Sequence, residues 1–289
     1  MNKFIRKILV FSIILIAYFG LNMFINFLIY SNQDVVLEGK RVLIVGDSHT
    51  AKGLNPYIFE SAENISQTGE PYILTYWKLR KILEINKPDT LIVGFGYHNI
   101  SEFNDLKFSN EKAAEMVRRS YSIGNFKELK NRIKIDWYLY YKILWRELAL
   151  YPKVNHTNFI GNYIDAKISN PLNVDKIIER HYFYNEKEMG ISDVAISYLD
   201  SIINICNNNK IIPILVGVPV HQSYFDEIPI KIIESYNGVK SKLENKQLKI
   251  IDKTIVFYPD SLFSDADHLN SYGASRFTKE VIKAIEKAE

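Results

Sequence analysis

The first thirty residues contain an apolar run that is long enough to cross a membrane. Residues 8–30 carry no charged side chain and consist mostly of Ile, Leu, Phe, Val and Met. About 20 such residues span the hydrocarbon core of a bilayer as an α-helix. The pattern therefore predicts a short tip and a transmembrane anchor in residues 1–30, with the lipid bilayer as the partner of residues 8–30.

The charges beside this run predict its orientation. Lys3, Arg6 and Lys7 precede it, and no acidic residue does. The positive-inside rule then keeps the N-terminus in the cytoplasm and the rest of the chain extracytoplasmic, in the periplasm or at the cell surface. A cleaved signal peptide would have a shorter apolar core and small residues in an Ala-x-Ala pattern. A buried core helix of this length would show a polar face, so a single-pass anchor is favoured.

Two asparagines interrupt the apolar run. Asn22 and Asn26 are one helical turn apart and share a helix face. Such residues can favour helix pairing in lipid. We favour the simpler interpretation, in which both are polar residues tolerated near the outer interface.

The remaining chain, residues 31–289, alternates between short apolar runs and amphipathic segments. The apolar runs are typical of strands buried on both faces, at 41–46, 90–93, 210–218 and 248–251. The amphipathic segments predict helices at 55–61, 72–86, 192–208, 227–245 and 271–287. Strands separated by helices predict a three-layer α/β/α domain with a parallel, flavodoxin-like sheet. Ligands of such sheets bind outside the carboxyl ends of the strands.

A long segment at about 100–190 breaks this alternation. It begins as a polar helical stretch and becomes strongly aromatic, with Trp137, Tyr141 and Trp145 at i, i+4 and i+8 on a helix. Such a stripe is more often packing than a binding platform. An insertion of this length between two strands is also a plausible cover for a site. Its sequence is compatible with a lid, a membrane contact or a partner site.

The composition excludes several classes of protein. Hydrophobic residues make up 47% and charged residues 24%, which rules out a disordered chain. The three basic residues before position 8 account for the whole net charge of +3. The body of the protein is therefore neutral and gives no sign of nucleic-acid binding. Cys206 is the only cysteine, which excludes an internal disulfide and a thiolate zinc site, and we expect it in a helix core.

The end of the first strand and a loop near the C-terminus carry the candidate chemistry. Ser48 follows the first strand in Gly-Asp-Ser-His, where its hydroxyl can act as a nucleophile and nearby backbone amides can stabilise an oxyanion. Asp265 and His268 form an Asp-x-x-His just before the last helix. A nucleophilic serine needs a histidine base and a carboxylate that orients it. We expect Asp265 to orient His268, because a sequence neighbour such as Asp267 seldom reaches the Nδ1 atom.

This arrangement resembles the SGNH (GDSL-like) hydrolase superfamily. The chain order of Ser48, Asp265 and His268 is that of the family, and the resemblance covers about residue 40 to the end without the insertion. It implies an oxyanion hole formed by the Ser48 amide, Gly69 and Asn99. The family usually writes the last block as Gly-x-Asn-Asp, whereas here the block before Asn99 is one residue longer.

Four further residues are candidates for substrate binding. His49 and His98 lie near the predicted site, and His221 with Tyr224 follows the strand at 210–218 on the same rim. Each of them is also compatible with an ordinary loop or packing role. The Asp-x-His formed by positions 47–49 resembles the opening of metallophosphoesterases, but their further metal motifs do not occur here. We therefore expect neither a metal nor an organic cofactor.

The resemblance implies a function at the cell envelope. It suggests a serine-dependent ester hydrolase or O-acyltransferase that acts on acyl esters, O-acetyl groups above all, of a cell-surface polysaccharide. The expected partners are an acylated glycan or another ester substrate, and a multi-pass membrane acyltransferase. The alternatives are a lipid esterase and a catalytically silent membrane scaffold that binds an envelope polymer. The presence of serine, histidine and aspartate together argues against the scaffold.

Overall fold

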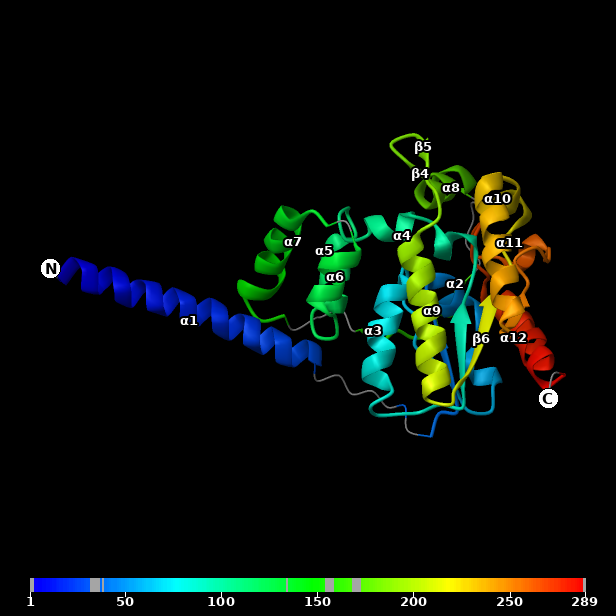
Figure 1. Cartoon of the computed structure of the whole chain (residues 1–289), viewed down its shortest axis with the longest axis horizontal. Helices are drawn as coiled ribbons and strands as arrows, with labels where there is room; N and C mark the ends of the chain where they lie inside the picture. The colour runs from blue at the N-terminus through cyan, green and yellow to red at the C-terminus, as the bar shows by residue number, and fades with distance from the viewer. Residues whose placement is uncertain are drawn as a thin grey trace. The chain divides into compact units, whose positions relative to one another are not determined.

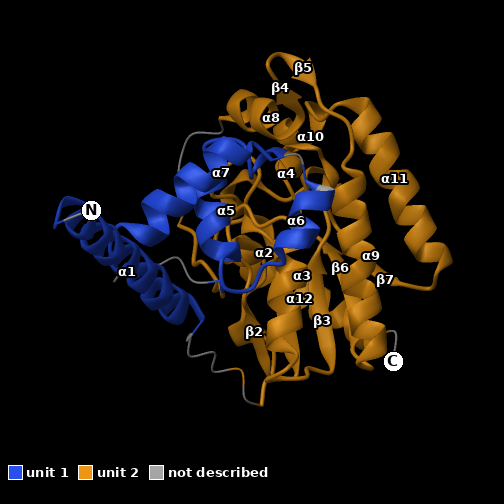
Figure 2. Cartoon of the chain, turned by 60° about the vertical axis from the view of Figure 1, so that its left-hand side comes forward, with its two compact units in different colours: residues 1–35, 106–159 blue, residues 36–105, 160–289 orange. Residues whose placement is uncertain are grey.

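The computed structural model describes residues 3–31, 37, 39–133, 135–153, 159–167 and 173–287. The chain divides into two units, which Figure 2 shows in different colours. Unit 1 comprises residues 1–35 and 106–159, and unit 2 comprises residues 36–105 and 160–289. The predicted insertion is thus split, because its first part belongs with the N-terminal helix and its second part with the sheet.

Unit 2 is built on a five-stranded parallel sheet. Its strands in chain order are β1 (Val42–Val45), β2 (Ala62–Asn64), β3 (Thr90–Gly94), β6 (Ile212–Gly217) and β7 (Lys249–Asp252). Their spatial order is β2-β1-β3-β6-β7, the flavodoxin-like order. The fold class predicted from the sequence is confirmed.

The sequence pattern misses the edge strand β2. A helix predicted at 55–61 is wrong: Pro56–Ile58 form one 3₁₀ turn, η1, that Asn55 caps through the Tyr57 amide. The chain then enters β2, which has only three residues and includes a charged Glu63. The strand forms because β1 offers it a free edge, where Ile44 pairs with Asn64. No apolar run marks such a strand.

Helices cover both faces of the sheet. Those of unit 2 are α2 (Ser48–Gly53), α3 (Tyr72–Ile82), α8 (Val174–Tyr182), α9 (Asp193–Asn208), α10 (Gln222–Asp226), α11 (Ile230–Asn245) and α12 (Ser271–Glu286). The shorter elements are η2 (Tyr97–Ile100), η4 (Asp260–Leu262) and the hairpin β4 (Phe183–Tyr184) and β5 (Lys187–Glu188), while α4 (Phe103–Leu106) lies at the boundary with unit 1. Helices α3 and α9 pack side by side (Figure 1), and α12 packs against α2.

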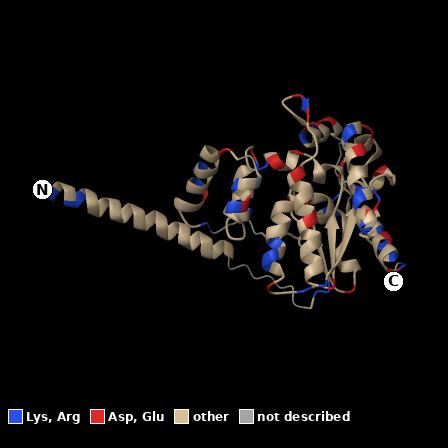
Figure 3. Cartoon of the chain, viewed as in Figure 1, with Lys and Arg blue, Asp and Glu red and all other residues tan. Residues whose placement is uncertain are grey.

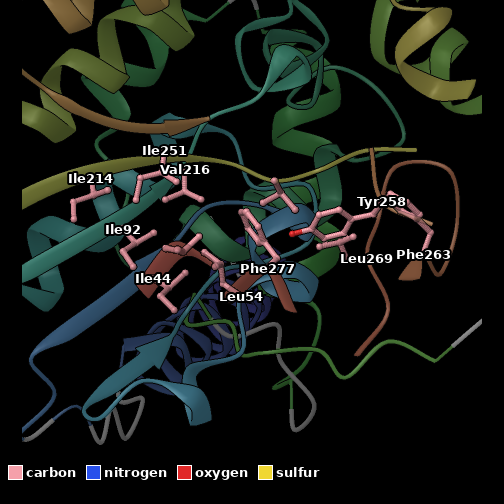
Figure 4. Close-up of a cluster of buried hydrophobic side chains, with 12 residues drawn as sticks. Ile44, Leu54, Ile92, Ile214, Val216, Ile251, Tyr258, Phe263, Leu269 and Phe277 are labelled. Carbon is pink, nitrogen blue, oxygen red and sulfur yellow. The ribbon is translucent and has the colours of Figure 1, made fainter. Parts of the chain in front are cut away.

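The sheet is buried on both faces, and α12 covers one of them. Figure 4 shows the central side chains of this core, which are Ile44, Ile92, Ile214, Val216, Ile251, Leu54, Phe277 and Leu269. Side chains alternate along a strand. Leu91 and Val93, the neighbours of Ile92 on β3, therefore point to the opposite face, and both are buried there as well.

Unit 1 consists of helices. They are α1 (Lys3–Ser31), α5 (Ala113–Ser120), α6 (Phe126–Arg132), α7 (Trp137–Leu144) and a π-helical turn, η3 (Trp145–Ala149), which continues α7. Helix α1 has a mean hydropathy of 2.5 over its most apolar window, and its length and composition suit a membrane span. Figure 3 shows its basic residues only at the N-terminal end.

The two asparagines of α1 bond to a helical segment of unit 1 that lies far along the chain. Asn22 donates to the carbonyl of Ala149 at 3.1 Å, and Asn26 donates to those of Leu148 and Tyr151 at 2.8 and 3.0 Å. The carbonyls at a helix end have no partner within the helix. Both asparagines are almost fully buried. The interpretation of these residues as polar groups tolerated near the interface is wrong, since they bind the end of η3.

Candidate active site

The turn after β1 presents Ser48 at the carboxyl edge of the sheet. Gly46 has a φ of +141°, and a Cβ there would lie 2.6 Å from the Thr50 hydroxyl, so this position requires glycine. Asp47 caps α2 by accepting from the His49 amide at 3.0 Å. Ser48 is the first residue of that helix and is partly exposed.

The loop before α12 brings His268 to this serine. The Nε2 atom of His268 lies 2.8 Å from the Ser48 hydroxyl, and its Nδ1 atom lies 2.7 Å from a carboxylate oxygen of Asp265. The loop is closed by a hydrogen bond from the Ser264 amide to the His268 carbonyl. It is also attached to the start of α10, because the His221 amide donates to the carbonyl of Ala266. The predicted residues Ser48, Asp265 and His268 therefore form one connected row.

A second carboxylate lies against the same histidine. Asp267 is buried, and its Oδ1 atom lies 3.1 Å from Nδ1 of His268. The expectation that a sequence neighbour does not reach this nitrogen is wrong. Among the described residues, that oxygen nevertheless has no hydrogen-bond partner, whereas Asp265 accepts one from Nδ1. Asp265 therefore has the better geometry to orient His268, and its role stays a prediction.

The two carboxylates control the protonation of His268. Burial alone would lower the pKa of His268, but the charge of Asp267 and the hydrogen bond to Asp265 raise it to about 9. Burial would likewise raise the pKa of Asp267, yet the charge of His268 and the hydrogen bond from His49 hold it well below its usual value. In the free protein at neutral pH, His268 is therefore protonated and Asp267 is ionised.

Asn99 is hydrogen-bonded to Asp47, the residue that precedes Ser48. Its amide Nδ2 donates to Asp47 at 2.9 Å, and its Oδ1 atom accepts from the Gly96 amide at 2.8 Å. The extra residue between Gly96 and Asn99 is accommodated in the 3₁₀ turn η2. Asn99 is thus fixed at the end of β3, next to the turn that carries Ser48.

Gly69 lies in a tight turn that follows β2. The Glu70 amide donates to the Gln67 carbonyl, and Gly69 has a φ of +67° at the third position of the turn. The Gln67 amide donates to the carbonyl of Gly46 at 3.0 Å. This bond places the turn beside the strand end that leads to Ser48. The structure thereby brings the segment of Gly69 to the same edge of the sheet as Asn99.

The two predicted binding histidines near Ser48 are buried. The rings of His49 and His98 lie 3.8 Å apart. His98 contacts Asp47 at 2.6 Å and His49 contacts Asp267 at 3.2 Å. Burial and the neighbouring His98 lower the pKa of His49 to about 4, so its ring is neutral. Both rings support the carboxylates around the row, and a direct contact with substrate stays a prediction.

The other two predicted binding residues lie on the rim after β6. The Tyr224 hydroxyl lies 2.8 Å from Nδ1 of His181 and 2.9 Å from the Tyr182 hydroxyl, and its side chain is almost fully buried. His221 contacts Ser223 and Asp260. A contact of Tyr224 with substrate would require it to give up these bonds.

Sequence reasoning missed two cations near the carboxylates. Lys52 lies 3.4 Å from Asp265, and Arg180 of α8 lies 3.8 Å from Asp267. Lys52 follows Ser48 by one helical turn, a spacing that could have identified it. Nothing in the sequence connects Arg180 to the site, because it belongs to the second part of the insertion.

The histidines and aspartates also meet the spacing of a metal site. Asp47, His49 and His98 form one such group, and His49, Asp267 and His268 form another. The hydrogen bonds described above account for both clusters, since each histidine Nε2 in the first group already contacts a carboxylate and His268 contacts Ser48. The donor atoms therefore fit a hydrogen-bonded network better than a metal centre.

The fold and the site together define a class. A parallel α/β/α sheet carries, at the end of its first strand, a serine in contact with a histidine and an aspartate, which is the side-chain arrangement of serine hydrolases.

Comparisons with known proteins give structural similarities only. No family model matches the chain, and no curated protein matches it. Among solved structures, it is similar to a GDSL-like lipase from Bacteroides thetaiotaomicron, with 14% identity, a TM-score of 0.43, and coverage of 92% of this chain and 100% of that chain. A lipase/acylhydrolase from Enterococcus faecalis is 15% identical, with a TM-score of 0.42 and coverage of 86% and 96%. A catalytic mutant of an acetylxylan esterase from Geobacillus stearothermophilus is 13% identical, with a TM-score of 0.42 and coverage of 86% and 94%. These similarities are too distant to assign a function, which has to come from the site.

Proposed function

We propose that the protein is a serine-dependent ester hydrolase or O-acyltransferase of the SGNH (GDSL-like) type. The observation that carries this proposal is the row of hydrogen bonds from Ser48 through His268 to Asp265, at 2.8 and 2.7 Å. A serine hydroxyl is a weak nucleophile unless a base removes its proton, and the base needs a partner that holds its orientation. The row supplies both.

The chemistry proceeds in two steps through an acyl-serine. The neutral His268 takes the proton of Ser48 while the serine oxygen bonds to the ester carbonyl carbon. The imidazolium then gives that proton to the departing alcohol as the ester C–O bond breaks. In the second step His268 activates water, for hydrolysis, or an acceptor hydroxyl, for transfer, and the serine is released.

Backbone and amide donors stabilise the oxyanion of this mechanism. The Ser48 amide lies at the start of α2, where N–H groups are not used by the helix. The Asn99 side chain has two amide hydrogens, and it donates one of them to Asp47. We assign the second one to the oxyanion, together with the amide of Gly69. Such donors are often worth about 10²–10³-fold in rate each.

The substrate is proposed from the context of the site. The membrane-length helix and its basic N-terminal end support an anchored protein with an extracytoplasmic catalytic unit. Ester groups available there include O-acetyl groups of envelope polysaccharides, which we propose as the substrate. A multi-pass membrane acyltransferase is the proposed partner. The anchor is equally compatible with a lipid ester, which makes this the second substrate class to assay.

Labelling and turnover by the full-length protein test the proposal. In detergent, the wild type should hydrolyse p-nitrophenyl acetate and gain the mass of one fluorophosphonate adduct. Ser48→Ala should lose both properties, while Ser201→Ala, a change on α9, should keep both. A folded wild type that neither turns over the ester nor takes up the label would instead support a silent scaffold.

A further inference from the structure

The segment 137–151, here called the aromatic segment, is bonded to α1 over several turns. The Tyr18 hydroxyl donates to the Leu150 carbonyl at 2.8 Å, near the middle of α1. Asn26 receives a hydrogen bond from the Lys153 amide at 2.7 Å, eight residues further along. Trp145 packs on Phe19 with ring centroids 4.3 Å apart. The position of the segment along α1 is therefore known.

The rise per residue of a helix gives the depth of these contacts in the membrane. A helix rises about 1.5 Å per residue, so Tyr18 lies only about 17 Å beyond Lys7, the last basic residue before the apolar run. The hydrocarbon core of a bilayer is about 30 Å thick. A hydrocarbon core that starts at Lys7 therefore extends past Tyr18 and ends near Phe27, so the residues bonded to Tyr18, Asn22 and Asn26 span its outer half and reach its outer edge.

The exposed side chains of the aromatic segment suit this level. Tyr138, Tyr141, Trp145 and Tyr151 expose 78, 55, 48 and 54% of their surface. Tyrosine and tryptophan are enriched where lipid meets water, because their rings are apolar and their tips are polar. An exposed aromatic cluster of this kind is otherwise unusual on a soluble surface.

The charges of the segment point the same way. Lys142 and Arg146 are exposed, and long basic side chains can extend to lipid phosphates. The single acidic residue of the segment, Glu147, is buried and contacts Arg118 at 2.9 Å and Arg146 at 3.0 Å. The segment therefore presents aromatic rings and the Lys142 ammonium group outward, which suits contact with lipid phosphates.

We propose that the aromatic segment lies at the boundary between hydrocarbon and headgroups in the outer half of the bilayer that α1 spans, with Trp145 and Tyr141 facing lipid. This inference rests on the membrane anchor proposed above. Unit 1 is then one membrane-bound body, in which Asn22 and Asn26 close the end of η3 where water is scarce. A stripe that the sequence presents as packing thereby contacts both α1 and lipid.

Tryptophan quenching in vesicles tests the contact. The chain has three tryptophans, and Trp77 is buried in α3 and serves as the internal control. The full-length protein is reconstituted in phosphatidylcholine–phosphatidylglycerol vesicles in which a fraction of the lipid is brominated on the acyl chain. We expect bromolipid to quench the wild type, and Trp145→Phe to lose at least half of that quenching. Trp137→Phe measures the share of the second tryptophan.

A reporter in the anchor separates the two proposals. Ile13→Trp places a tryptophan at an exposed site on α1, and it should be quenched strongly if α1 spans the bilayer. Quenching of this reporter without quenching of Trp145 would overturn the present inference and leave the anchor standing. An unquenched reporter would overturn both. Protection of Trp145 from bromolipid and from aqueous iodide alike would indicate that protein covers it, which also contradicts a lipid contact.

Discussion

The site of unit 2 and the contact between α1 and the aromatic segment within unit 1 both bury polar groups, but they use them differently. In unit 1 the amides of Asn22 and Asn26 are neutral, and carbonyl oxygens of the chain occupy their donors. In unit 2 the buried groups titrate, since two carboxylates flank His268 and raise its pKa to about 9. The first arrangement holds two segments together, and the second sets the protonation state of the proposed base. Substitutions should therefore affect stability in unit 1 and chemistry in unit 2.

Removal of the nucleophile or the base should have the largest effect. Ser48→Ala and His268→Ala are each expected to lower kcat by about 10⁴-fold or more, because the two groups act as a unit. The melting temperature should barely change in Ser48→Ala, whereas His268→Ala should lower it at neutral pH, because the buried carboxylate of Asp267 loses its cation. Steady-state turnover of p-nitrophenyl acetate measures the loss, and the double variant should be hardly worse than either single one. Additive losses would mean that the two residues do not share a step.

The two carboxylates should differ in their effect on turnover. Asp265→Asn replaces the charged acceptor of the Nδ1 hydrogen bond with an amide whose NH₂ can hold His268 in the wrong tautomer, and it should lower kcat by about 10³–10⁴-fold. Asp267→Asn should cost much less at its own optimum pH, since that carboxylate contributes charge without accepting the bond. Paired kcat measurements decide, and a larger loss in Asp267→Asn would reverse the assignment.

The pH dependence should show the charge of Asp267. His268 must be neutral to accept the serine proton, and its pKa is raised to about 9, so kcat/KM should rise with pH up to about 9. The value at pH 7 should be about 100-fold below the plateau. Asp267→Asn removes the largest cause of the increase and should move this rise toward the ordinary histidine pKa of 6.5. A rise centred near 6.5 in the wild type would contradict the proposed charge state.

The smallest effect is expected from the contact inside unit 1. Asn26→Leu leaves the carbonyls of Leu148 and Tyr151 without this donor and should destabilise unit 1 by about 1–3 kcal/mol. Ester turnover should not change. Proteolysis of the full-length protein in detergent measures the opening of unit 1, with Asn207→Leu on the exposed side of α9 as the matched control. Equal cleavage rates in the two variants would show that the hydrogen bonds of Asn26 contribute little.

Local patterns were sufficient for the sheet and for most of the site. Four of the five strands were predicted because a short β-branched apolar run is typical of a strand buried on both faces. Ser48 was identified because it closely follows the first strand. The Asp-x-x-His of residues 265–268 was identified because it closely precedes the last helix. The rule that ligands bind at the carboxyl ends of parallel strands then predicted that these two segments meet at one edge of the sheet.

Contacts between distant segments could only be decided by the tertiary structure. Strand β2 has no apolar run and exists because β1 offers it an edge. The approach of Asp267 to His268 depends on how the loop before α12 folds, and Arg180 reaches the site from an insertion with no sequence signal. Asn26 and Leu148 are 122 residues apart. Periodicity describes the face that a residue occupies on its own element, whereas the partner of a buried donor depends on which carbonyl the rest of the chain leaves unpaired.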